Sequence, residues 1–129
     1  MVKKKIFIYE EEAIVALDIK TILSQSGKYQ PVILRKNENF SAVFNSEKPE
    51  LIIASVNARL TFPEEILLPV KEAHIPMVIL AHSKPKSITA QLKLTLNGDI
   101  LLKPFDKDEL IFCVQHLIEE GADQSSLSK

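Results

Sequence analysis

Four polar residues each follow a short apolar run directly, namely Glu10, Ser55, His82 and Lys103, and Glu11 comes next after Glu10. Adjacent carboxylates suit Mg²⁺, and a lysine ammonium is a point charge for an anion such as phosphate. A serine near a histidine and a carboxylate is the arrangement of a nucleophilic hydrolase. The residues therefore allow two chemistries, metal-assisted anion binding and nucleophilic catalysis, provided that the fold brings them together.

The apolar runs before these residues are predicted to be buried strands. They are continuously apolar rather than alternating, which is typical of strands covered on both faces of a parallel sheet. The predicted strands cover residues 4–9, 30–35, 50–55, 76–81 and 99–102. Because parallel strands end at the same edge of a sheet, we expect the polar residues to share one crevice.

Amphipathic segments alternate with these strands. The first has an apolar stripe that Gly27 is placed to end, made of Val15, Ile19, Ile22 and Leu23. Further helices are predicted over 37–48, over roughly 63–73 with Pro69 inside, around 88–96, and from Asp106 onward. In the last helix, Asp106 as N-cap and Glu109 three residues later form a capping box.

Strict alternation of strand and helix predicts the fold class α/β, a doubly wound parallel sheet with five strands and right-handed crossovers. The length of 129 residues suits one domain. We expect that domain to cover residues 1–121, and residues 122–129 to form a polar, flexible tail.

The composition argues against several classes of function. The chain has 46% hydrophobic residues and a net charge of −1, so charge favours neither nucleic acid nor an anionic membrane as a partner. No apolar stretch approaches the ~20 residues of a membrane span, and the run after MVKKK is too short for a signal peptide. The single cysteine, Cys113, is expected to be a packed thiol in a reducing, cytoplasmic location.

Four segments resemble a known family: IFIYEEEAIVALDIKTIL, EKPELIIASVN, IPMVILAHS and DILLKPFDKDEL. Together they are similar to the receiver domain of bacterial two-component response regulators, the CheY-like domain, over about residues 3–120. The resemblance implies a flavodoxin-like three-layer sandwich with strand order 2-1-3-4-5 and a cis Lys103-Pro104 bond. It also implies a role in a phosphorelay, with a histidine kinase or an output protein as partner.

Receivers take a phosphoryl group from a kinase phosphohistidine onto an aspartate, and an acidic pair and that aspartate hold Mg²⁺. Glu10 and Glu11 match the acidic pair, and Lys103 matches the lysine that contacts the phosphoryl group. Here these three residues sum to about −1, against about −2 for a working site, and Lys103 can pair with a glutamate directly. We expect weak Mg²⁺ binding or none, and no other cofactor.

Three positions depart from the family pattern. Ser55 stands at the acceptor aspartate, Leu80 at the position of a Thr or Ser, and Ile100 at that of an aromatic residue. No aspartate lies between Asp18 and Asp99, so a shift in register does not restore the acceptor. The combination predicts a pseudo-receiver, which is not an enzyme and acts by protein–protein interaction independently of phosphorylation.

Two alternatives remain open. The first is a small-ligand sensor, in which the vacated crevice bounded by Glu10, Ser55 and Lys103 binds an amine or an anion. The second, more distant, is a hydrolase built from Ser55, His82 and Glu10. The absence of a G-x-S-x-G elbow around Ser55 argues against the hydrolase.

Three apolar residues are predicted to share an exposed face. Leu94 and Phe112 fall off the apolar stripes of their helices, and Ile100 lies on a strand expected at the sheet edge. Receivers commonly dimerise or meet output partners through the face made by these elements. The pattern therefore predicts a homodimer or a partner contact there.

Overall fold

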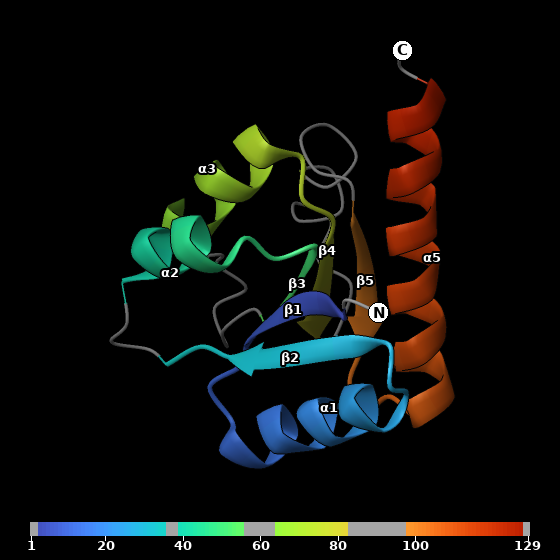
Figure 1. Cartoon of the computed structure of the whole chain (residues 1–129). Helices are drawn as coiled ribbons and strands as arrows, with labels where there is room; N and C mark the ends of the chain where they lie inside the picture. Colours follow the sequence, from blue (N-terminus) through green and yellow to red (C-terminus); the bar gives the residue numbers. More distant parts are fainter. Residues whose placement is uncertain (1–2, 36–38, 56–63, 83–97, 128–129) are drawn as a thin grey trace.

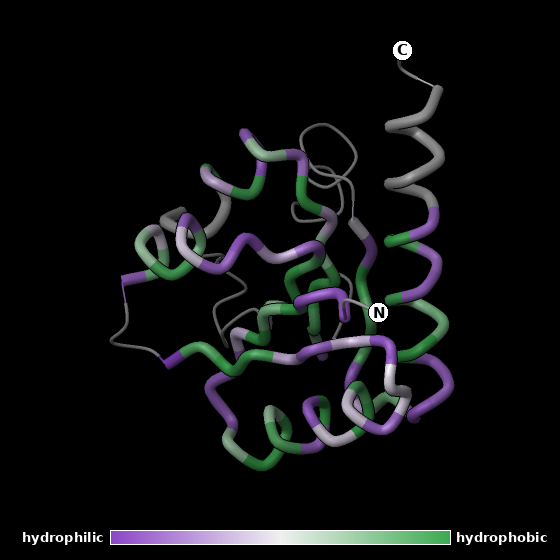
Figure 2. Tube along the Cα trace, in the orientation of Figure 1, coloured by the Kyte–Doolittle hydropathy of each residue, from purple (hydrophilic) through white to green (hydrophobic). Residues whose placement is uncertain are grey.

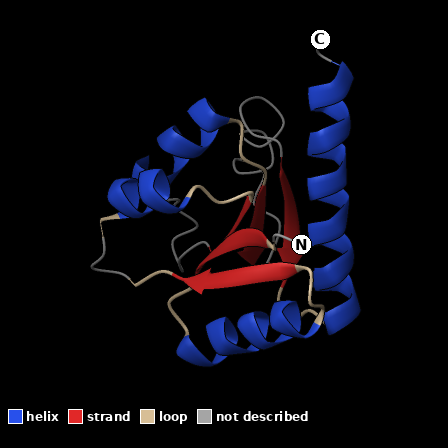
Figure 3. Cartoon of the chain, in the orientation of Figure 1, coloured by secondary structure: helices blue, strands red, loops and turns tan. Residues whose placement is uncertain are grey.

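A parallel sheet forms the centre of the protein (Figure 3). The computed structural model describes residues 3–35, 39–55, 64–82 and 98–127. Its strands are β1 (Lys4–Tyr9), β2 (Tyr29–Ile33), β3 (Leu51–Ser55), β4 (Met77–Ala81) and β5 (Gly98–Leu102). They pair in parallel in the order β2-β1-β3-β4-β5, which confirms the predicted fold class and strand order.

Helices cover both faces of this sheet (Figure 1). They are α1 (Ala13–Gln25), α2 (Phe40–Glu47), α3 (Glu64–Ala73) and α5 (Lys107–Leu127). One face carries α1 and α5, and the other carries α2 and α3. The helix predicted around 88–96 lies outside the described residues.

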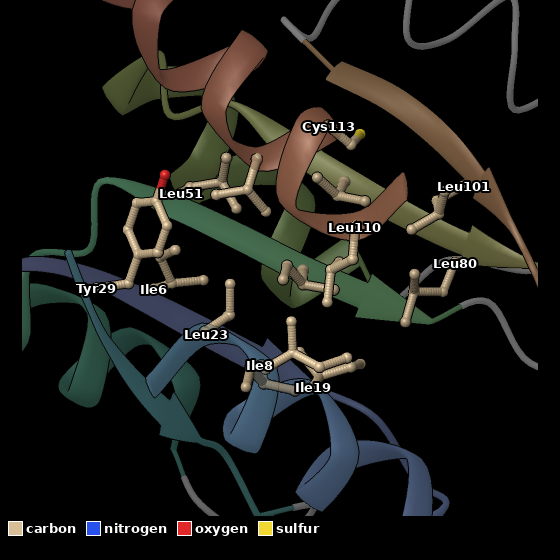
Figure 4. Packing of buried hydrophobic residues seen from close by; sticks show 14 of the residues in the cluster. Ile6, Ile8, Ile19, Leu23, Tyr29, Leu51, Leu80, Leu101, Leu110 and Cys113 are labelled. Atoms are coloured by element: carbon tan, nitrogen blue, oxygen red, sulfur yellow. The ribbon is translucent and has the colours of Figure 1, made fainter. Parts of the chain in front are cut away.

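The alternation of side chains along each strand divides the core into two layers. Ile6 and Ile8 of β1 point toward α1 and α5 and lie in one cluster with Leu110 of α5 (Figure 4). Phe7, between them in sequence, points to the opposite layer under α2 and α3. Burial on both faces explains why the strands are continuously apolar, and Figure 2 shows that hydrophobic character concentrated at the centre.

Local sequence features end and begin the helices as predicted. After α1, Gly27 adopts a φ of 75°, a left-handed conformation that glycine accepts without strain. At the start of α5, the Glu109 N–H donates to Asp106 Oδ1 at 2.8 Å, and the Asp106 N–H donates to Glu109 Oε1 at 3.1 Å. This reciprocal pair is the predicted capping box, and the Lys103-Pro104 bond before it is cis, as expected.

The last helix is longer than its apolar residues indicate. Helix α5 continues to Leu127, into the segment from 122, and the flexibility expected for that segment stays a prediction. The segment contains no proline, and extending a formed helix costs only the propensity of each added residue. Polarity alone was therefore a poor indicator of where this helix ends.

Candidate functional site

The carboxyl edge of the sheet brings three of the predicted site residues into contact. Lys103 Nζ donates to Glu10 Oε1 at 2.7 Å and to Ser55 Oγ at 3.1 Å. Glu10 follows β1, Ser55 is the last residue of β3, and Lys103 follows β5. The lysine side chain thus reaches across the end of β4 to join residues that are 48 and 93 positions away in sequence.

A backbone hydrogen bond to β4 fixes the position of the Lys103 main chain. The Lys103 N–H donates to the Ala81 carbonyl at 2.8 Å, which continues the β4–β5 ladder one residue beyond the strand. The backbone of Lys103 is therefore held in place, and its long side chain allows the ammonium to reach the ends of β3 and β1.

The Glu10–Lys103 ion pair is buried. The side chain of Glu10 is 1% exposed and that of Lys103 is 9% exposed. A charge taken out of water at this depth is tolerated only when an opposite charge and hydrogen bonds compensate it. The other carboxylate oxygen, Glu10 Oε2, is buried and has no hydrogen-bond partner among the described residues.

A second carboxylate lies at the rim of the site. Glu12 Oε1 is 4.0 Å from Lys103 Nζ, and its side chain is 63% exposed. Solvent screens this pair, so it adds little to the attraction that holds the lysine. Glu11, the other half of the predicted acidic pair, is also exposed. Within the described ranges, no group of three or more His, Cys, Asp or Glu residues is arranged to hold a metal ion.

The two predicted switch positions on β4 and β5 have different surroundings. Leu80 is fully buried and packs beside Leu101 under α5, so its side chain points into the core (Figure 4). Ala81, not Leu80, is the last residue of β4, and neither side chain has a hydroxyl. Neither of the last two side chains of β4 can therefore donate a hydrogen bond to a phosphoryl group. Ile100 is half-buried on β5.

The contacts of Ser55 also bear on the hydrolase alternative. Its hydroxyl oxygen accepts a hydrogen bond from a lysine ammonium that is itself held by a carboxylate. A protonated ammonium is a donor only and cannot take the serine proton as a general base. His82, the proposed base, is exposed on the wall of a separate hollow.

That hollow, of about 540 Å³, lies between α1 and the segment that joins β5 to α5. Ile14 and Leu17 on its α1 side are 84% and 57% exposed, and Phe105 lies on the other side. Of the crevice residues predicted to bound a ligand pocket, only Lys103 lines it. This hollow was not predicted, although Ile14 and Leu17 lie off the apolar stripe of α1, as Phe112 lies off that of α5.

Phe112 on α5 is 71% exposed, and its ring stacks on that of His116 with centroids 5.9 Å apart. Leu94, predicted to share its face, lies outside the described residues. Cys113, the next residue along α5, is buried as expected. Burial, reinforced by the negative charge of Asp99, raises the pKa of its thiol to about 11, so the thiol is neutral and unreactive near pH 7.

Comparisons with known proteins find the same fold in solved structures. No protein-family model and no curated protein sequence matches the chain. Solved structures do match. The signal receiver domain of a LuxO repressor protein from Vibrio parahaemolyticus superposes with a TM-score of 0.79 and 17% identity, covering 99% of both chains. The chemotaxis protein CheY4 from Vibrio cholerae gives 0.77 and 17%, covering 90% of this chain and 99% of its own.

A third match is NtrX from Brucella abortus, with a TM-score of 0.82 and 19% identity. It covers 98% of this chain and 29% of NtrX. At these identities the likeness establishes the fold, which is that of CheY-like receiver domains. What this chain does at its crevice must be argued from its own residues. In the described part of the structure, no helix is both long and apolar enough to cross a membrane.

Proposed function

We propose that the protein is a pseudo-receiver, a signalling domain of a two-component phosphorelay that acts through protein contacts and is not switched by phosphorylation. The observation that supports the proposal most strongly is the pair of contacts that the Lys103 ammonium makes. Its ammonium is engaged by the Glu10 carboxylate and the Ser55 hydroxyl, two groups of the site itself. The charge that would receive a phosphoryl group is already compensated.

The chemistry of the acceptor position supports the same proposal. An aspartate forms an acyl phosphate, which is labile enough to serve as a relay. A serine ester of phosphate is stable, and Ser55 has an ammonium rather than a base beside its oxygen. Ser55 is therefore poorly suited to take or pass on a phosphoryl group.

The electrostatics also disfavour a metal ion. Mg²⁺ sheds its water reluctantly and usually needs carboxylates together with phosphate oxygens. One carboxylate of the predicted pair, Glu10, is buried against Lys103, and the other, Glu11, is exposed. A cation entering this site would have to displace or tolerate the ammonium.

Exposed apolar side chains give the proposed interactions two surfaces. One holds Phe112 on α5, and the other holds Ile14 with Leu17 on α1. Apolar patches of this kind mark protein contacts more often than chance when they cluster. A histidine kinase or an output protein in the cytoplasm, or a second copy of the chain, is the proposed partner.

The experiment is an amide ¹H–¹⁵N spectrum of the protein with and without acetyl phosphate and Mg²⁺. We expect no shifts at Glu10, Ser55 or Lys103, and an unchanged spectrum across β4 and β5. Mg²⁺ without acetyl phosphate is the matched control. Large shifts at the carboxyl edge that require both reagents would overturn the proposal.

One observation favours a second function, a small-ligand sensor. The hollow beside Lys103 combines three charged groups, Glu12, Asp18 and Lys103, with His82 and an apolar wall. A thermal-shift screen of small carboxylates and amines tests it. A ligand that raises Tm in the native protein but not in the His82→Ala variant would support the sensor, and no hit would remove it.

A further inference from the structure

A second hollow, of about 300 Å³, lies at the amino ends of the strands. It is far from the crevice along the strand direction, because parallel strands carry their amino and carboxyl ends at opposite edges of the sheet. Three segments distant in sequence line it: the start of β1, the turn between α1 and β2, and the middle of α5. Figure 1 shows that turn beside α5.

Lysines gather around this hollow. Lys3, Lys4 and Lys28 line it and are exposed, and among the described residues Glu119 is the one acidic residue in its lining. The backbone fixes two of them side by side, since the Lys4 N–H donates to the Lys28 carbonyl at 3.1 Å. In a chain with a net charge of −1, these four residues carry a local charge of about +2.

The floor of the hollow is apolar. Tyr29 and Ile118 line it and are 4% and 8% exposed. Figure 4 shows the Tyr29 side chain extending from β2 alongside the core, with its hydroxyl at the far end. Burial, with a contribution from the Glu119 charge, raises the pKa of that hydroxyl, so the floor stays neutral up to alkaline pH. Beside it, the space over Gly27 is open, since no atom lies within 4 Å of where a side chain would begin.

We propose that this basic hollow, lined by Lys3, Lys4 and Lys28 over Tyr29 and Ile118, docks an acidic peptide segment of a partner protein. Carboxylates of the segment pair with the lysines, and one apolar side chain rests on the floor. The proposal adds a surface to those discussed above and does not depend on the chemistry at Ser55.

The chemistry of the lining favours a peptide over a phosphate. Lysines are point charges, and none of the described residues that line the hollow is an arginine, whose planar fork suits phosphate oxygens. A dianionic phosphate would also lie near the Glu119 carboxylate and would leave the apolar floor uncovered. Carboxylates spaced along a peptide match separate lysines and supply the apolar side chain as well.

The test is an amide-spectrum titration of the full chain with an acetylated, amidated peptide of sequence Glu-Asp-Leu-Glu-Asp. We expect saturable shifts at Gly27, Lys28 and Ile118 that weaken as salt is raised. Replacing the acids with Gln and Asn should abolish the shifts, and replacing Leu with Ser should weaken them.

The Lys4→Gln, Lys28→Gln double variant should bind the peptide about tenfold more weakly, as the loss of two exposed charge contacts implies. Lys20→Gln, which removes an exposed lysine of α1 outside the hollow, is the matched control and should bind normally. The double variant should keep its Tm, because it relieves repulsion between neighbouring lysines.

Three results would overturn the proposal: no shifts at millimolar peptide, equal shifts in the double variant, or the same shifts with inorganic phosphate. The last would show a general anion site. None of these results bears on phosphorylation at the crevice, so the two proposals fail independently.

Discussion

The Lys103 ammonium lies 2.7 Å from the buried Glu10 carboxylate, and this contact joins the end of β5 to the end of β1 across the carboxyl edge of the sheet. In a receiver, the lysine contacts the phosphoryl group and the acidic residues hold a metal ion. Here the Lys103 ammonium and the Glu10 carboxylate pair with each other, although Glu10 Oε2 has no hydrogen-bond partner among the described residues.

Removing the lysine should cost more than removing its partner. The Lys103→Met variant leaves the Glu10 carboxylate buried without a cation, and we expect a loss of about 3–5 kcal/mol in the free energy of unfolding. In Glu10→Gln the lysine keeps its hydrogen bond to Ser55, and its long side chain can turn the ammonium toward water, so the loss should be about 1–3 kcal/mol. Urea denaturation of the two variants measures both values.

The double variant completes the cycle. With both charges removed, much of the Lys103→Met cost should be recovered, because no uncompensated charge remains. Costs that simply add would contradict a strong coupling between the two side chains.

Restoring an acceptor should restore metal binding but not switching. The Ser55→Asp variant adds a carboxylate beside Glu10 and Lys103, which gives the site the charge that Mg²⁺ requires. We expect sub-millimolar Mg²⁺ to shift amide resonances near Glu11 in this variant and not in the native protein. Ser55→Asn, similar in shape but uncharged, is the matched control and should behave like the native protein.

The exposed aromatic residue on α5 should matter for association. If the β5–α5 face forms a homodimer, Phe112→Lys places a charge in its contact and should weaken it about tenfold or more. Sedimentation velocity over a concentration series measures this. Leu17→Lys, a similar change on the α1 surface, is the control. A native protein that stays monomeric at high concentration would remove the homodimer form of the proposal.

The thiol of Cys113 should make stability depend on alkaline pH. Its pKa is raised in the folded protein to about 11 from an ordinary value of 9.0. Between these values the folded protein holds a proton that the unfolded chain has lost, so the free energy of unfolding should fall as pH rises through that window.

The Cys113→Ala variant isolates this effect. It should cost about 1 kcal/mol at pH 7 from lost packing, yet show a shallower decline between about pH 9 and 11. Tyr29 is present in both proteins, so its contribution to the pH dependence of stability cancels in the comparison. Parallel stability curves for the two proteins would contradict the assignment.

The fold was predictable from the sequence because strands buried on both faces must be continuously apolar. Phe7 and Ile8 face opposite layers, and both must be apolar. The capping box of Asp106 with Glu109 and the left-handed Gly27 are likewise local, so residue types alone predict them. The end of α5 was missed because helix ends at a polar terminus have no comparable local marker.

In the candidate site, the pairing of Glu10 with Lys103 was predictable from their opposite charges. Glu10 and Lys103 are the charged groups that the fold forces inward at one edge, and opposite buried charges must compensate each other. The two hollows were not predictable, because each joins segments far apart in sequence. Tertiary packing decides whether space remains at either place. One hollow lies between α1 and the segment that joins β5 to α5, and the other lies between the α1–β2 turn and α5.

The most direct test of the central claim is the intact mass of the protein after incubation with acetyl phosphate and Mg²⁺. The Ser55→Asp variant should be run alongside, to report whether the fold can still accept a phosphoryl group once an aspartate is present. We predict that the native protein keeps its unmodified mass. A stoichiometric phosphoryl adduct on the native protein that is stable to acid and lost in alkali would mark an acyl phosphate, and it would contradict the account.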